Sequence, residues 1–175
     1  CVAADNKGTL YFGTNYGILV YKGEKRSSGK NWRFLLLPQP DVISSLYLDT
    51  LEKRLYVGGQ HDFGYFQLKN YFDGEYISLK GKMPDQSSDI WHIEKCGRTI
   101  IFHTLNRLIY LNDENLGSIE PWNNGIFHNV FKTSQNTLLI NGLDAGWFYF
   151  APHKKFALMN VQGLSIPADK CYSVL

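Results

Sequence analysis

The chain has 175 residues, of which 44% are hydrophobic and 15% aromatic, and its formal net charge is +2. This composition can bury a sizeable core and excludes a disordered tail. The near-neutral charge, with no basic cluster larger than those at 24–26 and 153–155, gives no support to nucleic-acid binding, and no apolar run is long enough to span a membrane.

Residues 1–37 predict four short strands in succession. Residues 1–12, CVAADNKGTLYF, contain a strand, a turn that ends at Gly8 and a second strand. Residues 10–21, LYFGTNYGILVY, contain an apolar run, a polar tip between two glycines and a second apolar run, which is the pattern of a β-hairpin. Residues 32–37, WRFLLL, predict the fourth strand.

The same pattern returns three more times along the chain. Hairpins of this kind lie at 55–66, 100–111 and 138–150, each with one strand before it and one after it. Helix signals are almost absent, because glycine or asparagine interrupts every candidate segment. We place the four units at about 1–37, 38–83, 84–124 and 125–165, with residues 166–175 as the start of a further unit.

Four-stranded units that repeat about every forty residues predict an all-β fold, the β-propeller. A β-sandwich is the alternative, but it does not explain the repeat. Stacked blades bury their faces against one another, so the outer blades should expose apolar faces, and other blades of the same protein are the expected partners. The chain begins with Cys1 and shows no signal peptide, and we expect it to be part of a longer protein with a larger propeller.

Glycines and aspartates recur beside the predicted turns. Asp5 and Asp49 are expected to bind their own backbone in turns. Two glycines, Gly13 and Gly58, are expected to end a strand where a side chain would crowd the neighbouring backbone. Three others are expected to begin the next strand, at positive φ or in a bulge: Gly17, Gly64 and Gly146.

These residues resemble the two-component-regulator-propeller repeats of Bacteroidetes periplasmic sensors, found in the ectodomains of hybrid histidine kinases and of triple-tyrosine, helix-turn-helix regulators. The resemblance is strongest over about the first ninety residues. In the first unit the blade pattern of the family is matched by Asp5, Gly8, Tyr11, Gly13, Thr14 and Gly17, and in the second by Asp49, Tyr56, Gly58, Gly64 and Tyr65.

Later units depart from the family pattern. The second unit has Glu52-Lys53 where the turn glycine would be. The third has His103 in place of the glycine that ends the strand, and Arg107 in its hairpin, whereas the fourth keeps Gly142 and Gly146. These motifs specify a blade more closely than they specify a ligand.

The resemblance implies a periplasmic, non-enzymatic sensing domain that recognises a small molecule or oligosaccharide, such as a glycan breakdown product. Signals would pass through a membrane segment and an output module outside these residues, with two copies paired across the membrane. The residues themselves leave two alternatives open: a propeller scaffold that binds protein partners, and a propeller-fold polysaccharide lyase or glycosidase.

Loops on one face of a propeller are the expected binding site. If the first strand of each unit is innermost, the tips of the central hairpins share that face. Trp91, Trp122 and Trp147 could add stacking surfaces for sugar rings, although core packing is the commoner role of tryptophan. Arg107 is the cation of this rim that could meet a carboxylate. The predicted ligand-binding residues are Asn15, Tyr16, Gln60, His61, Asp62, Asn106, Arg107 and Asp144.

Catalytic and metal chemistry receive less support from the sequence. The neighbours His61 and Asp62 could move a proton, but adjacent strand residues point to opposite faces, and a polar loop tip is the better explanation of the two. Asp62 and Asp144 are the best candidate pair for glycoside cleavage, and nothing nearby supports them. The five histidines are His61, His92, His103, His128 and His153. They are spread over three units without a close ligand pair, so we predict no metal. We also predict no cofactor and no catalytic residue.

Two smaller expectations concern packing. Trp91 and His92 alternate along one strand, so one of the two should pack between blades. The three cysteines are far apart and are expected to be buried or half-buried free thiols rather than disulfides: Cys1, Cys96 and Cys171.

Overall fold

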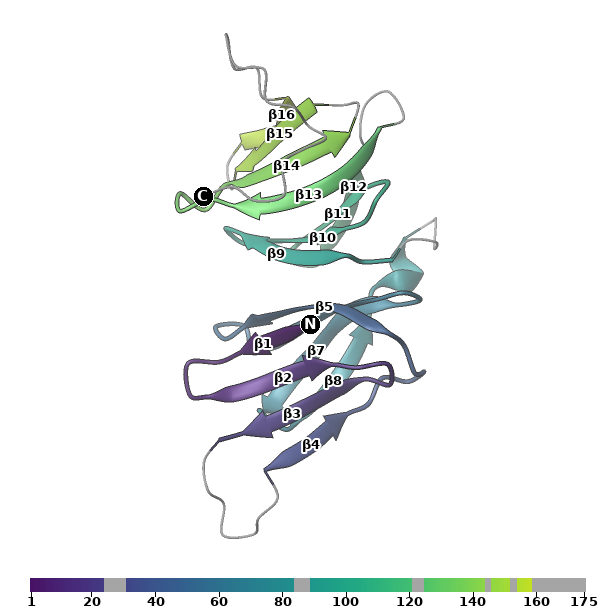
Figure 1. Cartoon of the computed structure of the whole chain (residues 1–175), viewed down its shortest axis with the longest axis vertical. Coiled ribbons are helices and arrows are strands. Elements are labelled where there is room, and N and C mark those ends of the chain that lie inside the picture. Colours follow the sequence, from purple (N-terminus) through teal and green to yellow (C-terminus); the bar gives the residue numbers. More distant parts are fainter. Residues whose placement is uncertain (24–30, 84–88, 121–124, 144–145, 152–153, 159–175) are drawn as a thin grey trace. The chain divides into compact units, whose positions relative to one another are not determined.

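The computed structural model describes residues 1–23, 31–83, 89–120, 125–143, 146–151 and 154–158. Apart from one turn of 3-10 helix, η1 (Lys80–Lys82), every regular element in these ranges is a β-strand (Figure 1). The predicted all-β fold is therefore confirmed. Over these ranges no helix is long and apolar enough to cross a membrane.

The described strands form four antiparallel sheets of four strands each, and each sheet uses consecutive strands in sequence order. This order follows from the short turns, because a strand joined by a tight turn can pair only with the strand before it. The first two sheets contain β1 (Val2–Ala4), β2 (Thr9–Gly13), β3 (Ile18–Lys22) and β4 (Trp32–Leu35), then β5 (Ile43–Asp49), β6 (Arg54–Gly59), β7 (Phe63–Asn70) and β8 (Asp73–Ser78).

The remaining two sheets follow the same plan. Each fits within the range of one predicted unit, so the strand assignments agree with the repeat. Their strands are β9 (His92–Cys96), β10 (Thr99–His103), β11 (Leu108–Asn112) and β12 (Asn115–Ile119), then β13 (Ile126–Lys132), β14 (Leu138–Leu143), β15 (Gly146–Ala151) and β16 (Lys154–Leu158).

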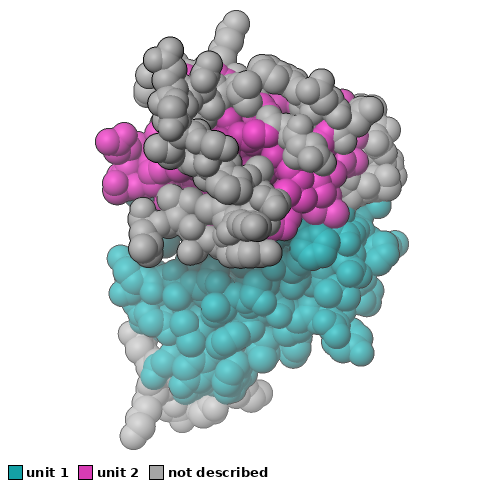
Figure 2. Space-filling view, turned by 45° about the horizontal axis from the view of Figure 1, so that its top comes forward, with its two compact units in different colours: residues 1–93 teal, residues 94–175 magenta. Residues whose placement is uncertain are grey.

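The chain divides into two compact units, residues 1–93 and 94–175 (Figure 2). Unit 1 is residues 1–93, and unit 2 is residues 94–175. Whether the four sheets together form one propeller segment stays a prediction, and residues 166–175, the expected start of a further blade, lie outside the described residues.

The core of unit 1 lies between its two sheets. The face of the first sheet that carries Tyr11, Ile18 and Val20 packs against Leu55 and Phe66 of the second sheet, and all five side chains are at most 1% exposed. The strands supply this interface because alternate residues point to one face. Within unit 2 a second core joins Cys96, Ile101, Leu108, Phe127, Leu138, Ile140 and Phe148.

The three hairpin tips that the structure describes in full are each hydrogen-bonded to a residue at the start of, or just before, a later strand. The carbonyl of Thr14 accepts from the amide of Ile43 at 3.0 Å, and the carbonyl of Gly59 accepts from Ile90 at 3.1 Å. In unit 2 the carbonyl of Leu105 accepts from Phe127 at 2.8 Å. Within unit 1 the bond to Ile43, and within unit 2 the bond to Phe127, fix the end of one blade to the start of the next.

Close approach at these contacts explains the strand-ending glycines. A Cβ on Gly13 would overlap the Cys1 sulfur and the Ile43 side chain, and one on Gly58 would overlap Ile90. The prediction is confirmed with one change, because side chains rather than backbone fill the space. The third sheet has His103 here, buried, with Nε2 3.1 Å from the Phe127 carbonyl oxygen.

Two of the three glycines predicted at positive φ are found there, and the third is not. Gly17 and Gly146 have φ of 140° and 86°. The prediction is wrong for Gly64, whose φ is not positive and which lies in regular pairing between β6 and β7. A Cβ at Gly64 would overlap the carbonyl of Ile77, so close packing of β8 is the reason for this glycine.

The cysteines are free where they are described. Cys96 is buried and its thiol donates to the carbonyl of Asn136 at 3.1 Å, and burial raises its pKa. Cys1 is exposed, so the expectation of a buried or half-buried thiol is wrong there. Cys1 immediately precedes β1, which is at the edge of its sheet. Cys171 lies outside the described residues.

The first sheet has an apolar face that the rest of unit 1 does not cover. Register places Leu10, Tyr21 and Trp32 in one row of this face, and Phe34 pairs with Leu19 on the next row. Trp32 and Phe34 are 54% and 47% exposed. In the second sheet the corresponding row contains Leu55, Phe66 and Tyr76, which belong to the core. The prediction of an exposed apolar face on an outer blade is confirmed for this sheet.

Replacing Gly58 with alanine should destabilise the protein, because the β-branched Ile90 cannot move its overlapping atoms away cheaply. We expect Gly58→Ala to lower the free energy of unfolding by about 1–3 kcal/mol, as overpacked cores do. Urea denaturation measures this. Gly81→Ala is the matched control, since a Cβ there meets nothing within 4 Å. Equal stability of the two variants would contradict the packing described for this strand end.

Lys53 occupies the left-handed backbone region, with φ of 53°, where the family pattern has a glycine. Since a side chain is disfavoured there, we expect Lys53→Gly to raise the free energy of unfolding by about 0.5–1 kcal/mol. The adjacent Glu52 is not left-handed, so Glu52→Gly should lower it instead. Urea denaturation of both variants tests the turn geometry, and a loss of stability in Lys53→Gly would contradict it.

Candidate functional site

The predicted rim of unit 1 consists of two hairpin tips. In the first, between β2 and β3, the Thr14 amide and hydroxyl both donate to the carbonyl of Gly17, at 2.9 Å each. The amide of Tyr16 donates to the Thr14 hydroxyl at 3.1 Å. The tip is thus closed on itself. Asn15 and Tyr16 are exposed, and Tyr16 presents 70% of its surface to solvent.

The second tip, between β6 and β7, is held by a buried carboxylate that the sequence reasoning did not single out. Asp41 precedes β5 and its side chain is 3% exposed. Its Oδ2 accepts from the amides of His61 and Asp62 at 2.9 and 3.0 Å, and its Oδ1 lies 3.0 Å from His61 Nδ1. Gln60 and His61 remain exposed. Asp41 is therefore the anchor of this tip.

These contacts separate the neighbours His61 and Asp62. His61 faces Asp41, whereas the Oδ1 of Asp62 accepts from the amide of Phe63 at 2.8 Å and from the Ser78 hydroxyl at 2.7 Å. A pair made of His61 and Asp62 is therefore not formed. Both carboxylates have structural hydrogen bonds, and these account for the polar residues of the tip without invoking catalysis.

Hydrogen bonding also sets the charge state of Asp41. Burial by itself would raise its pKa, but bonds from the His61 side chain and from the amides of His61, Asp62 and Val42 outweigh burial and lower it. The carboxylate is thus ionised over the physiological pH range, and it is most stabilising in that form.

The rim residues of unit 2 are on the tip between β10 and β11. Thr104 closes this tip as Thr14 does, with its amide and hydroxyl donating to the Arg107 carbonyl at 3.0 Å. Asn106 is exposed, but the Arg107 side chain is only 11% exposed and its Nη2 lies 3.9 Å from Glu120 Oε1. A ligand carboxylate would have to compete with Glu120. Asp144 lies outside the described residues.

Within unit 1 the structure brings two groups of predicted residues to the same end of adjacent sheets. The first tip bonds to Ile43 at the start of β5, and the second tip bonds to Asp41 two residues before it. Asn15 and Tyr16 are thereby on one side of this connection and Gln60, His61 and Asp62 on the other. Their role as ligand-binding residues stays a prediction.

The candidate stacking residues differ in exposure. Trp147 is buried and stacks on Phe131 at 6.2 Å between ring centroids, so it is a core residue. Trp91 is 54% exposed and His92 is also exposed, so the expectation that one of them packs between blades is wrong. Trp91 immediately precedes β9 and His92 is its first residue, ahead of the buried Ile93. Trp122 lies outside the described residues.

No group of three or more histidine, cysteine, aspartate or glutamate side chains among the described residues is arranged to hold a metal ion. The histidines have separate local contacts: His61 with Asp41, His103 with the Phe127 carbonyl, and His128 with Asn129. His153 lies outside the described residues. His61, His103 and His128 thus each contact a different protein group.

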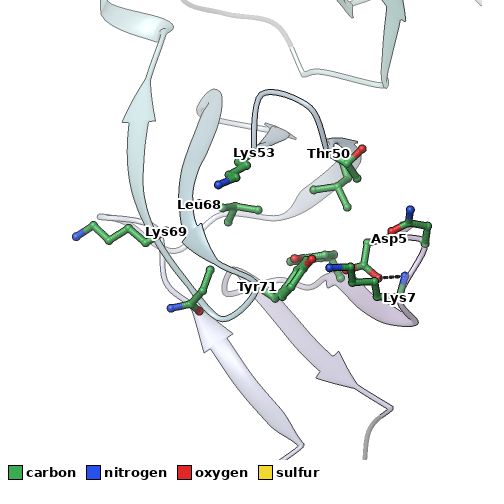
Figure 3. Close-up of a pocket in the computed structure, with 11 residues that line it drawn as sticks. Asp5, Lys7, Thr50, Lys53, Leu68, Lys69 and Tyr71 are labelled. Carbon is green, nitrogen blue, oxygen red and sulfur yellow. Dashed lines mark hydrogen bonds between the residues drawn. The ribbon is translucent and has the colours of Figure 1, made fainter.

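Unit 1 contains a cavity of about 450 Å³ that the sequence did not indicate (Figure 3). Three turns surround it: the turn after β1 over residues 5–7, the turn after β5 over residues 50–53, and the turn after β7 over residues 69–71. Tyr11, Leu48 and Leu68 complete its lining. Since these turns are at the opposite strand ends from the hairpin tips, the cavity and the predicted rim are on opposite ends of the sheets. We call it the turn cavity.

Local sequence chemistry shapes these three turns. Asp5 Oδ1 accepts from the amides of Lys7 and Thr9 at 2.8 and 2.7 Å, so Asp5 is the turn residue that was predicted. Asp49 likewise accepts from Leu51 at 3.1 Å. The pairing of β7 with β8 shifts register between Leu68 and Asn70, which is a bulge. Bulges redirect side chains and are frequent beside binding sites.

Solved structures with a similar fold include bacterial ectodomains. The extracellular domain of a B. thetaiotaomicron protein assigned as a one-component system, BT4673, has a TM-score of 0.60 and 19% identity, over 95% of this chain and 22% of that chain. The extracellular domain of BT3049, assigned as a hybrid two-component system of the same organism, has a TM-score of 0.61 and 18% identity, over 85% and 19%.

The WD40 β-propeller domain of Doa1 is also similar, with a TM-score of 0.61 and 14% identity over 89% of this chain and 52% of that chain. Identities this low show the fold, which confirms the propeller prediction and, at the level of fold, the resemblance to the bacterial ectodomains. The chain spans about a fifth of the length of each bacterial domain. No family model matches the chain, and no curated protein matches it.

Replacing Asp41 should destabilise unit 1 in a pH-dependent way. The folded pKa of Asp41 is lowered, so its contribution is fully present above the unfolded pKa of about 3.9 and is lost as the pH falls through the folded pKa. We expect Asp41→Asn to reduce the free energy of unfolding by about 2 kcal/mol at neutral pH, and by less near pH 3. Urea denaturation at both pH values checks this.

Asp73→Asn serves as the control, because Asp73 is an exposed carboxylate on β8 of the same unit. It should change stability by less than about 0.5 kcal/mol at either pH. A deficit of Asp41→Asn that stays constant as the pH falls would contradict the anchoring role of the ionised carboxylate.

Proposed function

We propose that the chain is part of an extracytoplasmic, ligand-sensing propeller of a signal-transduction regulator, and that it is not an enzyme. The observation that carries the proposal is the fold similarity to extracellular domains assigned to one- and two-component systems, which extends over 95% of the chain in one case. The sequence resemblance stated above supports the same assignment from independent features, namely the turn and hairpin motifs of the first two units.

The proposed cue is a carbohydrate-derived small molecule or oligosaccharide. In support, the two tips of unit 1 place exposed polar and aromatic side chains on one end of adjacent sheets, with Tyr16 the most exposed aromatic residue among them. Asp41 and Thr14 hold these tips in fixed shapes. A fixed polar surface loses less entropy on binding a sugar than a mobile loop does.

Signal transmission is proposed to act by population shift. A ligand that binds one arrangement of paired sensors more tightly than another favours that arrangement, by an amount equal to its difference in affinity. The bonds between each hairpin tip and the next sheet would carry a displacement at the rim directly to the neighbouring blade. The partners are then a second copy of the protein, and further blades.

Further blades are supported by the apolar face of the first sheet. Leu10, Tyr21 and Trp32 repeat the row that the neighbouring sheet covers in the second blade. Because an exposed row of this kind is costly in water, we infer that a preceding blade of the same protein covers it.

Two alternatives remain as outcomes of experiment. A protein-binding scaffold would show a protein partner and no stabilisation by small molecules. A propeller-fold lyase or glycosidase would form product from a polysaccharide, and activity would be lost in Asp62→Asn or His61→Ala. The structural hydrogen bonds of Asp62 to Phe63 and Ser78 favour the non-enzymatic reading.

The proposal predicts thermal stabilisation of the whole protein by a carbohydrate cue without turnover. A ligand at about a hundred times its Kd adds about 2.7 kcal/mol of stability, which raises the melting temperature by about 5–10 °C in a domain of roughly 150–250 residues and by less in a larger one. Differential scanning fluorimetry against oligosaccharide panels measures the shift, and chromatography of the incubated sugars measures turnover. Product formation would contradict the proposal.

Sequencing the encoding gene on both sides of these residues supplies the second test. We expect further blades, a membrane-spanning segment and a kinase or helix-turn-helix module in the same reading frame. A secreted catalytic module, or no membrane segment at all, would contradict the signalling role and leave the fold unaffected.

A further inference from the structure

The turn cavity of unit 1 concentrates positive charge. Three of its eleven lining residues are lysines, Lys7, Lys53 and Lys69, and one is a carboxylate, Asp5. A fourth lysine is close by, since the ammonium groups of Lys7 and Lys22 lie 5.7 and 5.8 Å from the centre of the Tyr71 ring. The whole chain carries a formal charge of only +2, so this is a local feature and not an average property of the surface.

The lysines are not equivalent. Figure 3 shows Lys7 beside Tyr71 and Lys53 on a separate turn, whereas Lys69 extends away from the other labelled residues. Lys53 is held in place by its own left-handed backbone and by its carbonyl, which accepts from the Leu68 amide at 2.9 Å. Lys7 and Lys53 therefore belong to two separate turns of the cavity lining, and the backbone of Lys53 is fixed there.

Two residues that line the cavity contain a buried polar atom without a hydrogen-bond partner. Tyr11 lines the cavity, is 0% exposed, and its hydroxyl has no hydrogen-bond partner. The Oδ2 of Asp5 is also buried and unpartnered, although Oδ1 is used in the turn. An unsatisfied buried polar atom costs free energy, so such atoms beside a cavity suit a ligand that supplies the missing bonds.

The chemistry of these two atoms is complementary. Burial, and then the proximity of Asp5 and Tyr71, raises the pKa of Tyr11 well above its usual value, so the phenol keeps its proton at neutral pH and can donate. Asp5 Oδ2 can only accept when ionised. A ligand hydroxyl can accept from Tyr11 and donate to Asp5 at once. Inorganic sulfate could use the lysines but has no proton to donate to Asp5.

The volume and the lining residues of the cavity restrict the size and the chemistry of a ligand that could bind there. A volume of about 450 Å³ is within the usual range of small-molecule sites, roughly 300–1,000 Å³. Leu48 and Leu68 provide apolar lining, and Asn6, Thr50 and Asn70 provide neutral polar groups. The site thus combines cations, hydroxyl-recognising atoms and a partly apolar wall, as recognition of a charged sugar requires.

We propose that the turn cavity binds a small hydroxyl-bearing anion of the acidic-sugar class, with Lys7 and Lys53 facing its carboxylate or sulfate and Tyr11 and Asp5 bonding its hydroxyl groups. The proposal goes beyond the proposed function, on which it rests only for the role of binding in sensing, because it adds a second ligand site to the predicted rim. It places that site at the opposite strand ends from the predicted rim.

The test is a titration of the whole chain followed by backbone-amide NMR. The probes are glucuronate, a glucose sulfate ester, neutral glucose and inorganic sulfate. We expect shifts confined to residues 5–8, 50–53 and 69–72 with the two acidic sugars, at least about fivefold tighter binding than of glucose or of sulfate, and weakening with salt. The tighter of the two acidic sugars identifies the anionic group.

Variants then assign the contacts. Tyr11→Phe should weaken acidic-sugar binding about fivefold while the chain stays folded, since it removes only an unsatisfied hydroxyl. Lys53→Gln should weaken acidic sugars by a similar factor and leave glucose unchanged. The controls are Tyr149→Phe, in unit 2, and Lys82→Gln, on η1 away from the cavity lining.

Several results would overturn the proposal: no shifts at the three turns with any probe, equal affinity for glucose, equal affinity for inorganic sulfate, or unchanged affinity in both Tyr11→Phe and Lys53→Gln. Failure of this site is separable from failure of the sensing role. If the whole protein responds to a glycan and Lys53→Gln does not alter the response, the cavity is wrong and the sensing role stands. If the cavity binds acidic sugars as expected but the gene encodes no signalling module, the cavity proposal stands and the sensing role is wrong.

Discussion

Burial of one sheet face by the next sheet is the interaction on which the rest of the structure depends. A four-stranded sheet of this size has two apolar faces and cannot bury either one alone. In unit 1 one face of each sheet is buried against the other sheet. The first sheet contributes Tyr11, Ile18 and Val20 to this contact, and the second contributes Leu55 and Phe66. The strand-ending glycines and the amide bonds from Ile43 and Ile90 follow, because the sheets must approach closely at the hairpin tips.

This packing gives the two ends of the sheets different character. At the hairpin tips the backbone is committed to bonds with the next sheet, and Asp41 or a threonine closes each tip. At the other strand ends of unit 1, three turns surround a cavity between its two blades. Lysines and an unsatisfied phenol line it. A propeller can therefore offer two chemically distinct surfaces, one rigid and polar, the other concave and cationic.

Sequence reasoning about the site succeeded where the relevant contacts are local. The turn roles of Asp5 and Asp49 follow from bonds to amides two to four residues away, which the residue type itself favours. The pairing of His61 with Asp41 spans twenty positions and was not foreseen. Neither was the cavity, since Lys7, Lys53 and Tyr71 come from three turns and share no spacing rule. The one local signal was Lys53 in place of the turn glycine.

The sequence by itself determined the strands, their order and the repeat, because alternation of apolar residues and turn-forming glycines and aspartates are properties of short segments. It also determined that the first sheet would expose an apolar face. Only the tertiary structure decided why Gly64 is a glycine, why Cys1 is exposed, and which polar atoms remain unpaired beside a cavity. Those facts depend on how closely separate strands approach one another, and distances between strands are set by packing of the whole unit.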